Sequence, residues 1–497
     1  METTEVIDGD QPVSKRAPFD LDIRTKPVGG WAGWRGPLAA TGLAALLRLP
    51  YLGQPHAVIF DETYYVKDSL ALLTFGHERK VIENADAALL ASGGENIQSI
   101  FTDAASYIVH PPVGKWIIAS GEAIFGATPF GWRIAIAILG ILSVLLTARI
   151  ARRLTKSNFI GTVAGVLLAL DGLHIAMSRT ALLDTSLSFF VLCAFGFLIM
   201  DRDSANLGGS KSWRWAMVLA LGLACATKWS GVYFAAAFGL LMLVWDYERR
   251  SKRLENLGSW ITKDFLPALL MPFAIIAIYI SSWIGWFRSS GGWNRNWAQE
   301  NDVTSWVPDS LVSLFHYHKD MLSFHTNLVT PHSYASNPWT WPLMIRPTSF
   351  YYQTDPTCGA EKCSQEVIPL GNPLIWWAGA IALVIVIYFA VTRRHSAALP
   401  IAVAFAAGWV PWLFFPARTT FSFYSVAFIP YTVMALALTL YLANQRVKST
   451  RPITLRWPTL TFVLVAAALT AFFYPILTGQ SISYEMWHLR MWLPTWV

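Results

Sequence analysis

Eleven long apolar stretches alternate with polar connections along this chain of 497 residues. A helix that crosses a bilayer needs about 20 mostly apolar residues, because its backbone groups must form hydrogen bonds within the segment. The stretch 112–127 is also apolar, but it is short and contains Lys115 and Glu122, so we expect it to lie at the membrane interface. The pattern predicts an all-α polytopic membrane protein with spans at 37–53, 130–150, 158–177, 184–200, 214–228, 231–246, 265–286, 373–392, 397–415, 421–443 and 458–478.

The basic residues between these stretches indicate the orientation. Cytoplasmic connections of membrane proteins are enriched in Lys and Arg. With a cytoplasmic N-terminus, the connections on that side contain Arg152, Arg153, Lys156, Arg202, Lys211, Arg214, Arg249, Arg250, Lys252, Arg253, Arg393, Arg394, Arg446, Lys448 and Arg451. Counting 112–127 as a span would move most of these residues outside. We therefore expect an N-in, C-out topology with two long extracytoplasmic loops at 54–129 and 287–372, lengths that are usually functional.

Composition supports this assignment. Only 14% of the residues are charged, whereas a soluble protein has about 25%. The 24 Trp, 29 Phe and 17 Tyr residues suit aromatic belts at two membrane interfaces. The net charge of +7 is divided among separate loops, which argues against nucleic acid as a partner. Residues 1–34 are polar and hold no signal peptide, so we expect a disordered cytoplasmic tail before one transmembrane domain at 35–497.

The four cysteines fall into two pairs. Cys193 and Cys225 lie within predicted spans, where free cysteines are usually buried packing residues. Cys358 and Cys363 lie in the second outer loop, on an oxidising side of the membrane, so we expect a disulfide between them. The spacing lacks a second ligand pair nearby, which argues against a zinc site.

Two adjacent carboxylates, Asp61 and Glu62, follow the first span directly. A carboxylate at the boundary of headgroups and water can accept a proton from an incoming hydroxyl, and partial desolvation raises its basicity. The alternative is a helix N-cap, since a helix-like run follows and Asp is favoured at that position. The pair alone leaves both interpretations open.

Several cations are expected at the same outer membrane face, where the positive-inside bias makes them sparse. One explanation is a bound phosphate, which Arg and Lys match in charge and geometry; the alternative is snorkelling to lipid headgroups. Within the third span, Asp171 and His174 are functional candidates or partners in hydrogen bonds between helices. The outer-face set consists of His110, Lys115, Arg133, Arg179, Lys228 and Arg418, with the acidic Asp184 beside them.

The second outer loop combines aromatic and polar residues. The sequence places His318 and His325 seven positions apart, followed by Trp339, Trp341 and Arg346. Aromatic rings pack on sugar C–H surfaces and suit sugar or peptide recognition, although they equally suit a headgroup belt. Two histidines alone are weak evidence for a metal site.

Six short motifs occur in a fixed order along the chain. Together they resemble the polyprenyl-phosphate-mannose–protein O-mannosyltransferases, and the resemblance runs from about residue 40 to 445. The large soluble insert of the eukaryotic members is missing from the second outer loop, so the chain resembles the compact bacterial branch. The motifs are FDE (60–62), HPPVGK (110–115), SRTALLD (178–184), TKWSG (227–231), YHKDMLSFH (317–325) and WTWPLMIRP (339–347).

This resemblance implies a GT-C glycosyltransferase fold in the plasma membrane. The donor would be polyprenyl-phosphate-mannose, and the acceptor a Ser or Thr hydroxyl on an exported polypeptide. Asp61 would be the general base and Glu62 its support, with inversion at the mannose; Asp184 would match the second acidic position of these folds. The donor phosphate would bind Arg133 and, among the other cations, His110, Lys115, Arg179, Lys228 and Arg418. The resemblance leaves a divalent metal and a partnership with the protein-export machinery open.

Two other function classes compete with this interpretation. A related lipid-linked glycosyltransferase could modify a glycolipid or a cell-wall glycan, and the long second outer loop favours a polypeptide acceptor only slightly. A transporter or flippase would also contain intramembrane charges, but transporters commonly show internal repeats. The sequence shows no such repeat, and its charges gather at one membrane face.

Overall fold

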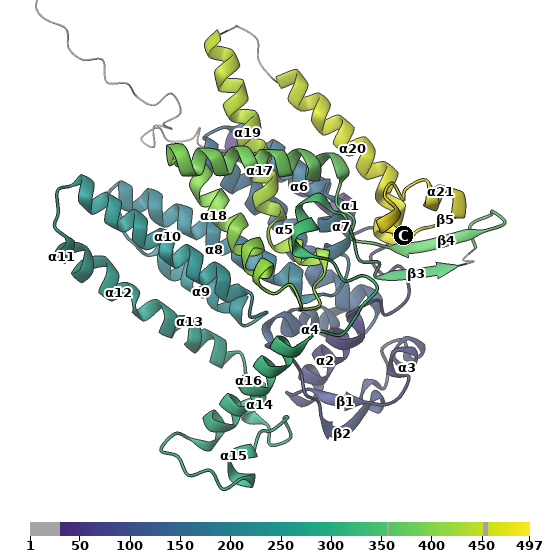
Figure 1. Ribbon diagram of the computed structural model, residues 1–497. Coiled ribbons are helices and arrows are strands. Elements are labelled where there is room, and N and C mark those ends of the chain that lie inside the picture. Colours follow the sequence, from purple (N-terminus) through teal and green to yellow (C-terminus); the bar gives the residue numbers. More distant parts are fainter. Residues whose placement is uncertain (1–29, 355–356, 451–455) are drawn as a thin grey trace, which may run out of the picture.

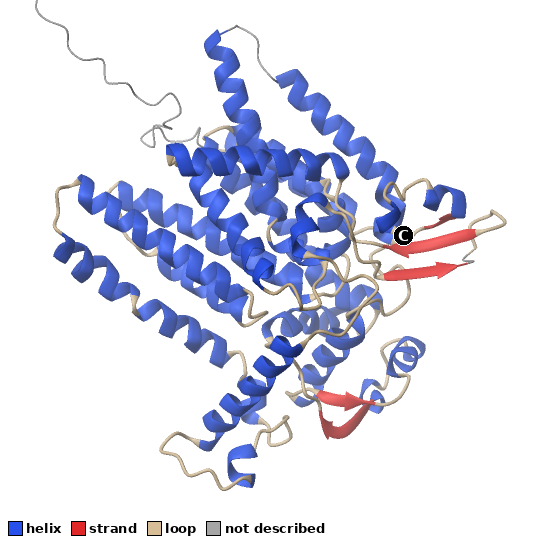
Figure 2. Cartoon of the chain, in the orientation of Figure 1, coloured by secondary structure: helices blue, strands red, loops and turns tan. Residues whose placement is uncertain are grey.

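The structure is a computed structural model that describes residues 30–354, 357–450 and 456–497, without the side chains of 445–450 and 456. Most of the predicted cytoplasmic tail (1–29), Arg451, and the side chains of Arg446 and Lys448 therefore lie outside the described residues. The described chain is mainly helical, with two small sheets at the periphery of the helical bundle (Figures 1 and 2).

Each predicted span coincides with a helical segment. Among the described residues, five helices are long and apolar enough to cross a membrane alone, or six if the bent pair α6 and α7 counts as one span. The count of eleven spans therefore stays a prediction. The segments are α1 (Ala32–Arg48), α5 (Pro129–Thr155), α6 (Asn158–Ala169) with α7 (Gly172–Ser178), α8 (Leu183–Asn206), α9 (Trp213–Cys225), α10 (Gly231–Lys252), α11 (Leu257–Trp260) to α13 (Leu270–Ser281) through η2 (Ile261–Phe265) and α12 (Leu266–Ala268), α17 (Pro373–Arg393), α18 (Ala398–Trp409) with η4 (Val410–Phe414), η5 (Ser422–Ala427) with α19 (Ile429–Thr450), and α20 (Arg456–Thr478).

The third predicted span is bent by 63° between α6 and α7. Asp171 caps α7 by accepting a hydrogen bond from the His174 backbone N–H at 2.9 Å, and it accepts a second from the Trp376 indole at 2.6 Å. The His174 ring lies 2.9 Å from the Arg48 guanidinium. The polar residues of this span thus hold the bend and connect neighbouring helices.

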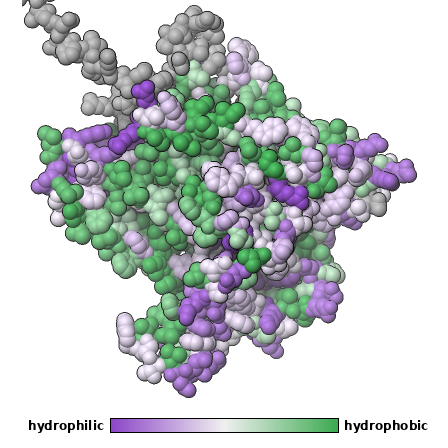
Figure 3. All heavy atoms as spheres, in the orientation of Figure 1, coloured by the Kyte–Doolittle hydropathy of each residue, from purple (hydrophilic) through white to green (hydrophobic). Residues whose placement is uncertain are grey.

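The helices pack closely around α5, α6, α8 and α19. A Cβ at Gly161 of α6 would lie 2.5 Å from Arg152 Cβ and 2.8 Å from the Ala148 carbonyl oxygen of α5, so only glycine permits this approach. By contrast, α13 exposes Phe273 and Ile276. Figure 3 shows this surface as a hydrophobic band between hydrophilic ends, as expected for a multi-pass membrane protein.

The first outer loop folds into a small module. It consists of α2 (Glu62–Phe75), β1 (Arg79–Val81), α3 (Ala85–Ser92), η1 (Ile97–Ile100), β2 (Phe101–Ala105) and α4 (Val113–Phe125). Strands β1 and β2 pair antiparallel. Helix α4 matches the predicted interfacial helix in position and packs against α2 and α5, burying Lys115 and Glu122.

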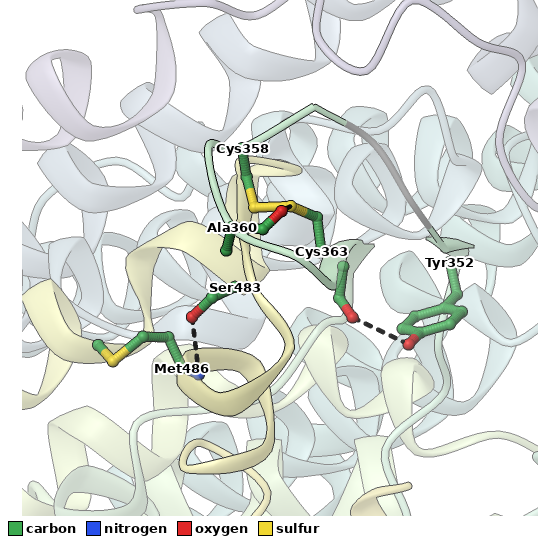
Figure 4. The surroundings of a disulfide bond; sticks show 7 residues. Tyr352, Cys358, Ala360, Cys363, Ser483 and Met486 are labelled. Carbon is green, nitrogen blue, oxygen red and sulfur yellow. Dashed lines mark hydrogen bonds between the residues drawn. A yellow bond between two sulfur atoms is a disulfide. The ribbon is translucent and has the colours of Figure 1, made fainter.

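The second outer loop contains strands that the apolar pattern did not predict. Its elements are α14 (Ile284–Arg288), α15 (Trp297–Glu300), α16 (Asp309–Asn327), η3 (Pro338–Leu343), β3 (Tyr351–Thr354) and β4 (Cys363–Val367). The segment after α20 adds β5 (Ser481–Ser483), α21 (Tyr484–His488) and η6 (Pro494–Trp496). The order β3–β4–β5 is antiparallel throughout, and a Cys358–Cys363 disulfide closes the β3–β4 turn (Figure 4). Cys193 and Cys225 are free.

Candidate active site

Asp61 occupies the N-cap position of α2, immediately before the helix begins at Glu62. Its side chain makes no capping hydrogen bond, so the N-cap interpretation does not hold for the carboxylate. Among the described residues no hydrogen bond or ion pair involves this carboxylate, which is only partly buried. A free carboxylate in this position is available to a substrate.

The residue before Asp61 is held in an unusual backbone conformation. Phe60 has φ = 47°, a left-handed value that non-glycine residues rarely adopt and that persists only where the surroundings enforce it. Its ring stacks on Phe350 at 4.5 Å between centroids and meets Phe423 edge-on at 5.4 Å. This aromatic contact fixes the backbone from which the Asp61 side chain projects.

The pKa of Asp61 is raised to about 6, mainly by burial. The positive charge of Lys228 lowers this pKa, and the negative charge of Asp184 raises it. At neutral pH the carboxylate is therefore mostly ionised yet more basic than an ordinary Asp. That combination suits a general base, whose best pKa lies near the working pH.

Glu62 has a different environment from its neighbour. It is completely buried, and Arg133 donates to both carboxylate oxygens at 2.8 Å. The backbone N–H groups of Ile59 and Ala181 donate to the same carboxylate at 3.1 and 3.0 Å. Glu62 thus connects the loop before α2 to the turn before α8, and its oxygens are fully occupied by the protein.

Arg133 and Arg179, both expected to bind phosphate, donate to protein oxygens instead. Besides Glu62, Arg133 donates to the carbonyls of Pro55 at 3.0 Å, Ala57 at 2.8 Å and Leu52 at 3.4 Å, so all five N–H groups are used. Arg179 donates to the three carbonyl groups at the end of α1, those of Arg48, Pro50 and Tyr51. These arginines hold the backbone between α1 and α2.

Lys115 is also paired within the protein rather than facing solvent or headgroups. Its ammonium group lies 2.5 Å from Glu78 and 3.7 Å from Asp68, and the side chain is 1% exposed. Burial raises the pKa of Asp68 to about 6, while the Lys115 charge acts against this rise. The three groups form a buried ionic cluster that connects α2, β1 and α4.

Lys228 and Asp184 form an ion pair next to Asp61. The Lys228 ammonium group lies 2.9 and 3.0 Å from the two Asp184 oxygens and 4.9 Å from the centre of the Tyr424 ring. Both members of the pair line a small pocket that is partly open to solvent. The remaining wall is mainly apolar and comes from Leu187, Ser230, Tyr233, Phe234, Ala407, Gly408, Trp412, Tyr424 and Ala427.

A second group of polar side chains joins His110, His325 and Arg418. The two imidazole rings stack at 5.2 Å, and His325 is held by the Val109 carbonyl at 2.7 Å and by Arg418, whose Nε donates to the His325 carbonyl at 3.1 Å. Burial, followed by the charge of Lys228, lowers the pKa of His110 well below its usual value. His110 Nδ1 and Arg418 Nη1 are buried without a hydrogen-bond partner in the described structure. Both groups retain hydrogen-bonding capacity for a ligand.

The other residues of the second outer loop have separate positions. His318 bonds to the Tyr279 hydroxyl at 2.7 Å, and Arg346 donates to the Ser333 carbonyl at 2.7 Å. Trp339 is exposed, whereas Trp341 is buried with its ring 5.8 Å from Tyr424. Of these four residues, only Trp341 packs its ring against a residue of the pocket wall, Tyr424. In the described part of the chain no three His, Cys, Asp or Glu residues are grouped to hold a metal ion.

Four aromatic residues of the pocket wall were not among the predicted site residues: Tyr233, Phe234, Trp412 and Tyr424. Tyr424 and Trp412 line the pocket and lie 5.0 Å apart between ring centroids. Both fall within stretches predicted as spans, and a hydropathy pattern does not distinguish a ring that faces a pocket from one that faces lipid. The sequence signal that could have identified Trp412 and Tyr424 is their position close to Arg418.

The sequence matches two family profiles. Residues 38–282 match the dolichyl-phosphate-mannose-protein mannosyltransferase family, and residues 310–496 match the C-terminal four-transmembrane region of protein-O-mannosyltransferase. The chain is 35% identical to a polyprenol-phosphate-mannose–protein mannosyltransferase of Mycolicibacterium smegmatis, over 95% of this chain and 94% of that protein. It is 31% identical to a protein of the same name from Corynebacterium glutamicum, over 88% of each chain.

Solved structures show the same fold. The Saccharomyces cerevisiae Pmt1–Pmt2 complex bound to the sugar donor aligns with a TM-score of 0.75 at 15% identity, covering 96% of this chain and 94% of that one. ArnT from Cupriavidus metallidurans in the apo state aligns with a TM-score of 0.52 at 16% identity, covering 89% of this chain and 76% of that one. The predicted GT-C fold is thereby confirmed. This chain belongs to the dolichyl-phosphate-mannose-protein mannosyltransferase family.

Proposed function

We propose that the protein transfers mannose from polyprenyl-phosphate-mannose to Ser or Thr hydroxyls of exported polypeptides, at the extracytoplasmic face of the plasma membrane. The names of the relatives state a polyprenol-phosphate-mannose donor and a protein acceptor. The observation that carries the proposal is the unpaired Asp61 carboxylate, with a pKa of about 6 that responds to the charges of Lys228 and Asp184. These two residues pair with each other and line the pocket. This arrangement joins a base to a cation and a lipid-compatible wall.

The reaction uses Asp61 as the base. Its carboxylate accepts the proton of the acceptor hydroxyl while the hydroxyl oxygen forms a bond to C1 of mannose. The bond between C1 and the phosphate oxygen breaks, and polyprenyl phosphate leaves with the electron pair. Attack from the face opposite the leaving group inverts the configuration at C1.

The leaving phosphate needs positive charge rather than a proton donor, because its pKa is low. Lys228 is the best-placed cation, since its charge acts on Asp61 and the side chain lines the pocket. Arg418 Nη1 and His110 Nδ1 supply further unused hydrogen-bonding groups. Leu187 and Phe234 belong to the wall of the same small pocket, so apolar side chains adjoin the cation that would hold the phosphate.

The remaining predicted site residues position this machinery. Glu62 and Arg133 fix the loop that carries Asp61, Arg179 fixes the end of α1, and Lys115 connects α4 to the rest of the outer module. Asp184 orients Lys228. In this account the donor-binding cations reduce to Lys228 and Arg418, with neutral His110 beside them.

The acceptor class is tested with purified protein and polyprenyl-phosphate-mannose. One reaction contains a Ser/Thr-rich peptide, a second contains the same peptide with Ala at every Ser and Thr, and a third contains a glycolipid or cell-wall glycan. We expect mannose in the first peptide only. Transfer confined to the glycolipid or glycan would select the related lipid-linked glycosyltransferase instead.

A further inference from the structure

Strand β3 (Tyr351–Thr354) forms the edge of its sheet. It pairs with β4 on one side, and no strand of the described chain pairs with it on the other. Three of its four residues are exposed. Such an edge presents unpaired backbone groups to any extended chain, and proteins usually protect edges with Lys, Pro or a bulge. The sequence Tyr-Tyr-Gln-Thr contains neither Lys nor Pro, and its pairing with β4 is regular.

The edge is held in place before any ligand arrives. The Cys358–Cys363 disulfide closes the turn that follows β3, and the Tyr352 hydroxyl shares a hydrogen bond with the Ser364 hydroxyl at 3.1 Å (Figure 4). The Tyr352 ring also packs on Trp487. Behind the strands, the buried Glu366 carboxylate accepts hydrogen bonds from Ser349 at 2.7 Å and from the Trp487 indole at 2.6 Å. An ordered edge of this kind loses little entropy when a partner strand binds.

The same strand is connected to the candidate base. β3 begins one residue after Phe350, whose ring stacks on Phe60 at 4.5 Å, and Phe60 directly precedes Asp61. An extended chain advances about 3.3 Å per residue. A polypeptide paired with β3 and continuing past Phe350 therefore needs roughly three or four further residues to bring a hydroxyl to Asp61.

We propose that the free edge of β3 binds the acceptor polypeptide as an added strand and directs it toward Asp61. This inference rests on the proposed function and adds the mode of acceptor recognition. Backbone hydrogen bonds provide the affinity in strand addition, whatever side chains the ligand carries. The enzyme would then accept polypeptides of unlike sequence, provided that they are extended and carry Ser or Thr at the right distance from the paired segment.

Acceptor peptides with methylated backbone amides test this proposal. The parent peptide carries a single Thr, and a series carries one N-methyl group at each position on either side of it, with every side chain unchanged. We expect KM to rise roughly fivefold to tenfold for each hydrogen bond that a methyl group removes, with kcat unchanged. The rise should occur at alternate positions, three or more residues from the Thr, and on one side of the Thr only. Uniform KM values across the series would overturn the proposal.

A photo-crosslinking experiment supplies an independent readout. The parent peptide carries benzoylphenylalanine about seven residues from the Thr, on the side that the methylation series identifies, which at the rise of an extended chain lies opposite the end of β3. We expect crosslinks to Gln353 or Thr354, with Asp103 of the first outer module as the matched exposed position that remains unmodified. Crosslinks elsewhere, or capture of β3 by β3 of a second copy of this chain, would overturn the proposal. If the unmodified parent peptide receives no mannose, the proposed function fails, which is distinguishable from failure of the β3 proposal alone.

Discussion

Arg133 binds both oxygens of the Glu62 carboxylate at 2.8 Å, and neither side chain has exposed surface. Removing one partner of a buried ion pair leaves the other charge unpaired, which typically costs about 3–5 kcal/mol. Because this pair fixes the loop that carries Asp61, it contributes to catalysis through position rather than through contact with the substrate.

Substitution of Glu62 should therefore lower stability and activity together. We expect Glu62→Ala to reduce the melting temperature of the detergent-solubilised protein and to reduce transfer by more than the loss of folded protein, because the loop that carries Asp61 is no longer fixed. Asp61→Asn should not lower the melting temperature. Loss of transfer in Glu62→Ala with an unchanged melting temperature would instead assign Glu62 a direct role in the reaction.

The rate of mannose transfer should depend on the ionisation of Asp61. Since burial raises its pKa to about 6, the carboxylate is protonated at lower pH and cannot accept a proton. We expect kcat to fall as the pH drops below about 6 and to reach a plateau above about 7. A rate that is unchanged down to pH 5 would contradict this assignment of the base.

The charges around Asp61 should shift that profile in opposite directions. The Lys228 charge lowers the pKa of Asp61, and the Asp184 charge raises it. Lys228→Met should therefore move the midpoint to higher pH, whereas Asp184→Asn should move it to lower pH. The Lys228 variant should also raise the donor KM, roughly tenfold to a hundredfold, because a charge-assisted contact to phosphate is lost. Equal midpoints in both variants would contradict the electrostatic account.

Ionisation of Asp61 should also destabilise the folded protein. Its pKa in the folded protein lies above the ordinary value of 3.8, so ionisation disfavours folding at pH values above about 6 and has no effect below about 4. We expect Asp61→Asn to raise the melting temperature slightly at pH 7.5 and to match the parent at pH 4. If the Asn variant is less stable than the parent at pH 7.5, ionisation of Asp61 does not destabilise the fold, and this prediction is wrong.

Membrane orientation can be tested with two exposed positions. Cysteine at Asp103, in the first outer module, should react with a membrane-impermeant maleimide added to intact cells. Cysteine at Ser251, in the last turn of α10, should react only after permeabilisation. The native Cys193 and Cys225 are partly or fully buried and serve as the background. The reverse pattern would invert the predicted topology and place the candidate site on the wrong side.

The sequence predicted the helices well because apolar length alone determines whether a segment can cross lipid. It also drew attention to Asp61, since two acids directly after a span are unusual. It did not predict β3 to β5, which are three to five residues long and too polar to produce an apolar pattern. The sequence did not predict the bend at Asp171 either, because Asp171 contacts Asn372 and Trp376, which are about 200 positions away.

The cations illustrate a second limit. Sequence showed that Arg133, Arg179 and Lys115 would gather near one membrane face, but it could not show which atoms they bind. The oxygens that satisfy Arg179 belong to Arg48, Pro50 and Tyr51, about 130 residues earlier. Only the folded chain distinguishes a guanidinium that binds backbone carbonyls from one that is free for phosphate.

The most direct test of the account compares Asp61→Asn with Asp103→Asn, an exposed carboxylate of the same outer module. Transfer of mannose to a Ser/Thr peptide is measured at pH 7.5 with saturating polyprenyl-phosphate-mannose, on variants of equal melting temperature. Loss of a general base costs about 10²-fold to 10⁴-fold, so we expect a loss of this size in Asp61→Asn and none in Asp103→Asn. Parental activity in Asp61→Asn would remove Asp61 as the base and contradict the central claim.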